Sequence, residues 1–276
     1  MKLGLSIGYS GAQMDLPVAR VQLAERLGYD SVWVMDHLFN TGYIRERLED
    51  KPYYHPLGTL SYLAATTKKV LLGTSVLVLP YHNPVELAKY TASLDQMSGG
   101  RVTLGVGVGA MTEEFQALGI PMRQRASLTN ESIKLMRELW SSPSPSYHSR
   151  RWEFSDLYFS PKPVQKPSIP IWVGGSSPGA LQRVATLGDG WHPSGVSPEE
   201  YSLAKREIED LAVGAGRATG PAPERMVEIG DVGKTQTAGQ LRHVAVTAAQ
   251  PPAGVLHAHL VAQAGELRAF VVQPAL

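Results

Sequence analysis

The sequence has no cysteine among its 276 residues. This absence excludes a disulfide framework and catalysis by a thiol. An excess of one charge is also lacking, because 26 Lys and Arg residues face 25 Asp and Glu residues, for a net charge of +1. A chain so balanced has no electrostatic footprint for nucleic acid or for an anionic membrane surface, so we expect neither partner.

Long apolar runs are missing too. No run reaches the ~18 apolar residues of a membrane span, and the apolar stretch after Met1 is shorter than a signal peptide needs. We therefore expect a cytoplasmic protein. Its length is close to the ~250 residues of one (β/α) barrel, which can bury a large core without a metal ion. One domain over residues 1–276 is expected, with no metal site.

The most informative segment that is present is Ser31-Val32-Trp33-Val34-Met35-Asp36-His37. A strand covered on both faces reads as continuous hydrophobic residues, and residues just past the carboxyl end of a barrel strand face the active site. Asp36 and His37 are therefore candidate catalytic residues. The alternative is a turn in which Asp36 acts as a cap and His37 is a solvated neighbour.

Short β-rich runs alternate with amphipathic helices, which is typical of βαβ units and a parallel sheet. Gly119 and Pro121 are expected to interrupt one of the helices, because proline breaks an interior turn. The pattern predicts an α/β fold, a (β/α)8 TIM barrel. Strands are expected at 3–7, 31–35, 70–79, 102–106, 169–173 and 190–192, and helices at 16–27, 57–67, 84–97, 113–139 and 180–187.

Two segments depart from this alternation. Residues 141–167 are rich in proline and carry aromatic residues, which predicts an insertion after the fourth strand-helix unit rather than a domain linker. Residues 221–276 have a blurred periodicity. There we expect a seventh strand at 226–229, a helix at 238–248 and an eighth strand at 267–272.

Glycines at two strand ends form a second chemical signal. Gly107 and Gly109 lack side chains, so a planar ring or a phosphate can approach the backbone closely. Gly174, Gly175 and Ser176 lead into a helix whose first N–H groups can face a phosphate. The alternatives are glycines that accommodate large neighbours in a barrel, and a well-capped helix without a ligand.

Taken together, the motifs resemble those of the bacterial luciferase-like monooxygenase family, and their order and spacing match it over residues 1 to about 200. They are Trp33 to His37, Gly73-Thr74-Ser75-Val76, Pro84 to Lys89, Ser98 to Gly107, Pro161 to Pro167, Pro170 to Gly175 and Leu187 to Trp191.

The resemblance implies a TIM barrel that binds a flavin or the deazaflavin coenzyme F420 at the carboxyl ends of its strands. Asp36-His37 resembles the coenzyme F420-dependent branch in particular. In that branch a non-prolyl cis peptide lies behind the cofactor ring, and Ser75-Val76 matches its position. The sequence departs from the sugar-phosphate dehydrogenases of the branch, because Ala110 replaces a glutamate and Thr41 replaces a tryptophan, which disfavours that substrate class.

We therefore expect an oxidoreductase that uses coenzyme F420 to transfer a hydride to or from a small organic substrate. Asp36 would orient His37, and His37 would donate or accept the accompanying proton, since its ordinary pKa of ~6.5 lies near working pH. The alternatives are an FMN-dependent monooxygenase and a flavin-binding barrel protein without turnover. The resemblance also allows a homodimer.

Overall fold

The computed structural model describes residues 2–7, 14–48, 52–217, 225–231 and 267–273. Eight strands form one sheet in the order β8-β7-β4-β3-β2-β1-β10-β9. All neighbouring pairs from β8 to β1 are parallel, as the alternating pattern predicts. These parallel strands are β1 (Lys2–Ile7), β2 (Ser31–Val34), β3 (Leu71–Val78), β4 (Val102–Gly107), β7 (Ile171–Gly174) and β8 (Gly190–His192).

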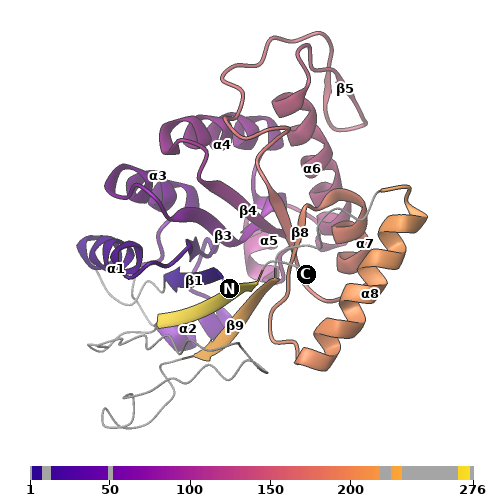
Figure 1. Ribbon diagram of the computed structural model, residues 1–276. Coiled ribbons are helices and arrows are strands. Elements are labelled where there is room, and N and C mark those ends of the chain that lie inside the picture. The colour runs from indigo at the N-terminus through magenta and orange to yellow at the C-terminus, as the bar shows by residue number, and fades with distance from the viewer. Residues whose placement is uncertain (1, 8–13, 49–51, 218–224, 232–266, 274–276) are drawn as a thin grey trace, which may run out of the picture.

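Helices pack along the parallel strands and surround them on the outside (Figure 1). The sequence fixes the ends of α4 in a recognisable way. Asn83 Oδ1 accepts a hydrogen bond from the Val85 N–H at 2.9 Å, Pro84 takes the first helical position, and Gly99 ends the helix with φ 71°. The main helices are α1 (Asp15–Arg26), α3 (Pro56–Thr66), α4 (Pro84–Ser98), α6 (Arg125–Ser141), α7 (Pro178–Leu187) and α8 (Pro198–Gly214).

The expected interruption of the long helix at 113–139 is confirmed. Helix α5 (Thr112–Ala117) is separated from α6 by a segment with Gly119 and Pro121 and the 3-10 turn η2 (Met122–Gln124). Two helices were not expected from the sequence, α2 (Gly42–Leu48) and α8. The start of α8 carries a capping box between Ser197 and Glu200, and this signal could have predicted it.

The C-terminal strands correct the expectation of a complete (β/α)8 barrel. β9 (Arg225–Asp231) and β10 (Leu267–Gln273) occur where strands seven and eight are expected, but β10 is antiparallel to both β1 and β9. Alternating apolar residues predict a strand and leave its direction open. Because β8 and β9 lie close together, the sheet is curved. It has six parallel strands, and β10 is antiparallel to both of its neighbours. The helix expected at 238–248 lies outside the described residues.

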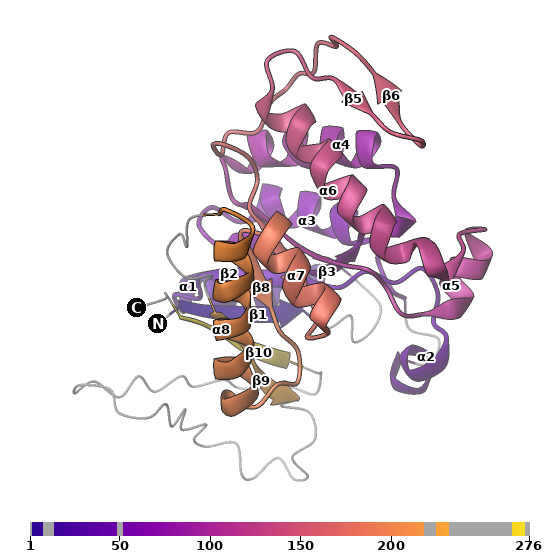
Figure 2. The ribbon, with the colours of Figure 1, turned by 90° about the vertical axis from the view of Figure 1, so that its right-hand side faces the viewer.

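The proline-rich segment between α6 and β7 contains a small hairpin, β5 (Tyr147–His148) with β6 (Glu153–Phe154). The hairpin forms its own two-stranded sheet and lies beyond α4 and α6 (Figure 2). In the same proline-rich segment, after the hairpin, the peptide bonds Ser160-Pro161 and Lys166-Pro167 are cis. This segment thus adds to the molecule outside the main sheet.

Large and small side chains alternate across the interior of the parallel strands. Trp33 on β2 lies beside Gly73 on β3, where an added Cβ would come within 2.2 Å of the indole. Trp172 on β7 lies beside Gly190 on β8 in the same way, at 2.6 Å. The two indoles are 5.3 Å apart between ring centroids. Side chains packed in this way fill the interior between the parallel strands.

The opposite, amino edge is held together by Arg101, which directly precedes β4. Its guanidinium donates hydrogen bonds to the carbonyl oxygens of Ala64, Thr67 and Val70, to the Thr67 hydroxyl and to the Ser98 carbonyl, at 2.7 to 3.2 Å. One side chain therefore joins the ends of α3 and α4 to the start of β3.

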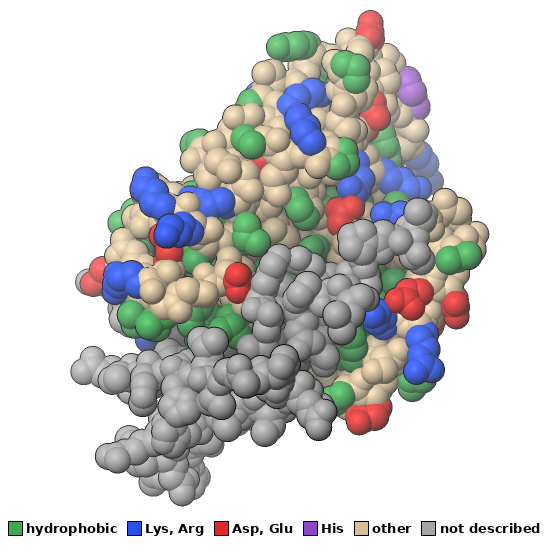
Figure 3. All heavy atoms as spheres, viewed as in Figure 1, with side chains coloured by type: hydrophobic (Ala, Val, Ile, Leu, Met, Phe, Trp, Pro, Cys, Tyr) green, Lys and Arg blue, Asp and Glu red, His purple; other side chains and the backbone are tan. Residues whose placement is uncertain are grey.

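Side chains of both charge signs occur on the described part of the face in Figure 3, as the net charge of +1 suggests. Within the described ranges, no helix is both long and apolar enough to cross a membrane.

A candidate active site at the carboxyl edge of the sheet

Residues that follow β2, β3, β4, β7 and β8 meet at one edge, because parallel strands end on the same side of a sheet. Of the sequence-predicted residues, Asp36 and His37 follow the end of β2, and Ser75 and Val76 lie in the carboxyl-terminal half of β3. The glycines at 107, 109, 174 and 175 and Ser176 lie on the same edge, at the ends of β4 and β7. The groups contact one another in pairs that the sequence does not reveal.

Asp36 is fixed by the segment that follows β3. The carboxylate is buried, and its Oδ2 accepts a hydrogen bond from the Val78 N–H at 2.9 Å and lies 3.0 Å from His82 Nε2. The other oxygen, Oδ1, is buried without a hydrogen-bond partner among the described residues. A buried carboxylate oxygen without a donor is costly, so this atom is a candidate to receive a hydrogen bond from a ligand.

His37 lies beside a different carboxylate. Its Nδ1 is 3.4 Å from Oε1 of Glu114, a fully buried residue on α5, and its ring meets Tyr53 edge-on at 5.4 Å. The expectation that Asp36 orients His37 is therefore corrected, since Asp36 pairs with His82 and Glu114 is the carboxylate at His37. Side chains of consecutive residues after a strand point to different sides, which separates the two.

Glu114 is surrounded by hydrogen-bond donors. Its Oε1 accepts from the Leu38 N–H at 2.6 Å, and its Oε2 accepts from the Tyr81 hydroxyl at 2.6 Å. Burial by itself raises the pKa of Glu114, but the hydrogen bonds from His37, Tyr81 and Leu38 together bring this pKa below its ordinary value. Glu114 is thus a carboxylate at neutral pH and can stabilise a proton on His37.

The Ser75-Val76 peptide is cis and non-prolyl, as the resemblance implies. The pairing of β3 with β4 shifts register there, between Thr74 and Leu77. Val76 fills the space that two of the predicted glycines leave open, because an added Cβ would lie 2.6 Å from Val76 at Gly107 and 2.9 Å at Gly174. These glycines therefore accommodate a large neighbour, which was one of the two alternatives.

His192 is a site residue that the sequence reasoning missed. It ends β8, is buried, and places Nε2 at 2.9 Å from the Ser75 hydroxyl. Burial lowers its pKa to about 4, although a hydrogen bond to the Pro193 backbone opposes the shift. His192 is therefore neutral at working pH. A polar residue at the end of an apolar strand, the signal that identified Asp36 and His37, also marks His192.

The remaining predicted residues lie nearer to solvent. Gly109 has φ 76° and approaches Val78 and Phe115, and Gly175 has φ 98°. Gly175 and Ser176 are exposed and precede α7, whose cap is formed by Ser177 Oγ accepting from the Ala180 N–H at 3.3 Å. The well-capped helix is thus present, and an anion at Gly175 and Ser176 stays a prediction.

His82 and Glu114 were also missed as functional residues. Each follows a predicted strand by several residues, so only the path of the intervening turn brings it back to the edge. Among the described residues, no group of three or more His, Asp and Glu side chains is placed so that it could hold a metal ion.

The chain matches the family model of luciferase-like monooxygenases over residues 4–232. An uncharacterized protein of Mycobacterium tuberculosis is 30% identical over 245 residues, which cover 80% of this chain and 85% of the relative. The F420-dependent glucose-6-phosphate dehydrogenase of Amycolatopsis mediterranei is 32% identical over 240 residues, which cover 84% and 67%. The solved coenzyme F420 dependent tetrahydromethanopterin reductase of Methanopyrus kandleri shares the fold, with a TM-score of 0.64 and 22% identity over 79% of this chain and 63% of that one.

Proposed function

Because the chain belongs to the luciferase-like monooxygenase family, we propose that it is an oxidoreductase that uses coenzyme F420 to transfer a hydride to or from a small organic substrate. The F420 dependence named for the Amycolatopsis relative supports the choice of cofactor. The observation that carries the proposal is the buried Asp36 Oδ1 without a partner in the described part of the chain, on the same edge as the His37–Glu114 pair.

The residues at this edge fit a planar ring with N–H donors. Asp36 Oδ1 is an acceptor that still needs a donor, while its Oδ2 is held by Val78 and His82. A hydrogen bond from a ring N–H would remove the free-energy penalty of a buried carboxylate oxygen without a donor. Ser75 and Val76, supported by Gly107 and Gly174, would form the wall behind the ring, and Gly109, Gly175 and Ser176 would face its anionic tail.

When bound, coenzyme F420 supplies a hydride donor or acceptor that resists reaction with oxygen. The protein supplies the proton that accompanies this transfer. His37 is the group that donates or accepts it, and the ionised Glu114 holds the imidazole in place through Nδ1. The backbone N–H of Leu38 and the Tyr81 hydroxyl keep Glu114 aligned for that task.

For the substrate we propose a small organic molecule rather than a sugar phosphate. Ala110 is exposed and has no carboxylate to offer, and Thr41 offers a hydroxyl in place of an indole. We expect glucose 6-phosphate to give no turnover with coenzyme F420, measured as the absorbance change on F420 reduction under anaerobic conditions. The Amycolatopsis enzyme is the positive control, and turnover of glucose 6-phosphate by this chain would contradict the proposed substrate class.

The proposal is tested by titrating the protein separately with coenzyme F420 and with FMN, following the fluorescence of its five tryptophans. Saturable binding of F420 and weaker binding of FMN are expected, with hydride transfer that proceeds without oxygen. Oxygen-dependent product formation with FMN would replace the proposal by a monooxygenase. Binding of either cofactor without turnover of any carbonyl or alcohol substrate would point to a non-catalytic flavin-binding protein.

A further inference from the structure

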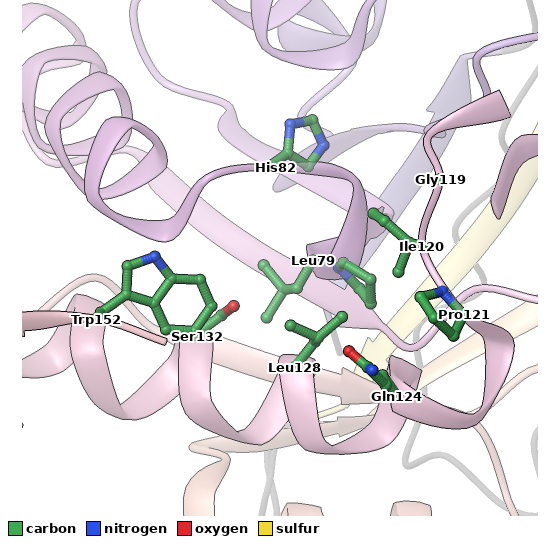
Figure 4. A pocket seen from close by; sticks show the side chains of 10 residues that line it. Leu79, His82, Gly119, Ile120, Pro121, Gln124, Leu128, Ser132 and Trp152 are labelled. Carbon is green, nitrogen blue, oxygen red and sulfur yellow. The ribbon is translucent and has the colours of Figure 1, made fainter. Parts of the chain in front are cut away.

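A hollow lies behind η1 (Leu79–Tyr81), the short 3-10 helix that follows β3, and has a volume of about 270 Å³. It is bounded by η1, by the segment between α5 and α6, by α6 itself and by Trp152 next to the hairpin strand β6 (Figure 4). Its wall is made of Leu79, Pro80, His82, Gly119, Ile120, Pro121, Gln124, Leu128, Ser132 and Trp152.

The wall is apolar over most of its extent. Leu79, Leu128 and Ile120 lie between Trp152 at one end and Pro121 at the other (Figure 4). No Lys, Arg, Asp or Glu side chain belongs to the wall formed by the described residues. Such a surface accepts a neutral molecule with an apolar body, because a charged one would lose its hydration without gaining a partner.

One nearly buried polar side chain in this wall has no hydrogen bond within the described residues. Ser132 on α6 is only 2% exposed, and it lines the hollow. Elsewhere on α6 the hydroxyls bond back to the helix, as Thr129 does to the Arg125 carbonyl and Ser141 to the Arg137 carbonyl, both at 2.8 Å. The described residues provide no such hydrogen bond to the Ser132 hydroxyl, and Figure 4 shows its oxygen between Trp152 and Leu79. The hydroxyl is therefore open to the hollow and can donate a hydrogen bond to an acceptor on a ligand there.

We propose that this hollow is a second ligand site, which takes a small neutral molecule with an apolar ring and one hydrogen-bond acceptor. The ring packs between Leu79, Leu128 and Trp152, and the acceptor receives the Ser132 hydroxyl proton. The volume lies just below that of sites for drug-sized molecules, which limits the ligand to about one or two rings. The ligand of this hollow is distinct from the cofactor proposed for the carboxyl edge, and His82 borders both sites.

The test uses the full chain without cofactor and acetophenone as the probe, because it carries one apolar ring and one carbonyl acceptor. The indole N–H signals of the five tryptophans are followed by NMR, and Trp152→Phe assigns the signal of Trp152. Addition of acetophenone is expected to shift the Trp152 signal saturably. The Trp140 signal is expected to stay unchanged, since that indole is buried and bonded to the Ala88 carbonyl.

Three variants decide the outcome. Leu128→Trp fills the hollow and should abolish the shift, whereas Ser132→Ala removes one hydrogen bond and should weaken binding about fivefold. Ser141→Ala, the same substitution on the same helix but outside the hollow, should leave binding unchanged. A Trp152 signal that does not move up to the solubility limit of the probe, a shift that persists in folded Leu128→Trp, or unaltered affinity in Ser132→Ala would overturn the proposal.

Discussion

At the scale of single residues, Asp36 and His37 are neighbours in the chain that serve different partners. Asp36 is held by Val78 and His82, so that one oxygen stays available, while His37 is held by Glu114. Because of this separation, the proposed cofactor contact and the proposed proton transfer belong to different residues. The residue that would contact a cofactor and the residue that would move a proton can each be changed without directly removing the partner of the other.

The proton-transfer role of His37 predicts a loss of rate rather than of affinity. His37→Ala should lower single-turnover hydride transfer with coenzyme F420 by at least ~100-fold, the lower range of general acid-base catalysis. Cofactor affinity, measured by titration of the same variant, should change far less. His148→Ala is the control, because His148 lies on the hairpin with a side chain that is 62% exposed. If His37→Ala instead loses the cofactor and keeps its transfer rate, His37 is a binding residue.

The contact between His82 and Asp36 predicts a positioning role that a second donor can rescue. His82→Leu removes the donor from a buried carboxylate and should weaken coenzyme F420 binding about tenfold, in keeping with a hydrogen bond to a charged group. His82→Gln retains an N–H donor and should bind within about threefold of the original protein. Fluorescence titration measures both, and equal affinity of the two variants would show that Asp36 does not need His82.

The sequence identified part of this residue pattern. Asp36 and His37 could be placed because they follow the end of β2, which is a local property, whereas Ser75 in β3 was placed by its resemblance to a family motif. Glu114 and His82 could not be paired with them, because their contacts depend on the paths of α5 and η1 after two different strands. Partner choice among buried polar groups is set by these turns and not by sequence separation.

At the scale of elements, the end of β3 and the glycines of β4 and β7 form one packed unit. Val76 occupies the space beside Gly107 and Gly174, and His192 at the end of β8 reaches Ser75. Strand ends on four neighbouring strands are therefore fixed relative to one another. The glycine pattern was interpreted from the sequence as access for a ligand, but the direct neighbour of these two glycines is a valine side chain.

This packing predicts that Gly174→Ala disturbs the fold as well as the site. The added Cβ would lie 2.9 Å from Val76 Cγ1 and 3.3 Å from the Val106 carbonyl oxygen, so the free energy of unfolding in urea should fall by about 1–3 kcal/mol. Gly179→Ala in α7 is the matched control, since nothing lies within 4 Å of its added Cβ, and it should raise stability by about 0.4–1 kcal/mol. Equal stability of the two variants would contradict tight packing at Val76.

Most helices and all parallel strands could be predicted at this scale, because their signals are local. Pro84 and Gly99 mark the ends of α4, and Gly119 and Pro121 mark the break before α6. The direction of β10 could not be predicted, since a run of apolar residues fits parallel and antiparallel pairing alike.

At the scale of the whole molecule, two buried groups make stability depend on pH in the same direction. His192 keeps its proton off until the pH falls to about 4, whereas in the unfolded chain it is protonated below its ordinary value near 6.5. The contribution of neutral His192 to the free energy of unfolding is therefore complete above pH 6.5, and it is lost as the pH falls from there to about 4. Glu114 has a pKa below its ordinary value of 4.5, so its contribution is present above that pH and is lost only in stronger acid.

The loss of stability that is linked to His192 can be measured by urea unfolding at about pH 7 and at about pH 5. The original protein should lose about 2 kcal/mol more than His192→Gln between these conditions, because only the former carries a neutral buried imidazole that the unfolded state can protonate. His148→Gln, at an exposed position, should keep the pH dependence of the original protein. Identical slopes in all three proteins would show that the fold does not lower the pKa of His192.

The hydrogen bonds of Arg101 at the amino edge have a consequence for how this molecule can be re-engineered. They secure α3, α4 and β3 at the end of the sheet that carries none of the candidate catalytic side chains. The loops at the other end can therefore be exchanged without loosening the anchorage of the scaffold. Libraries that randomise exposed positions in the segments after β2 and β4, while retaining Arg101, Asp36, His37 and Glu114, should yield many folded members, which makes the chain a tractable host for selecting new substrate preferences.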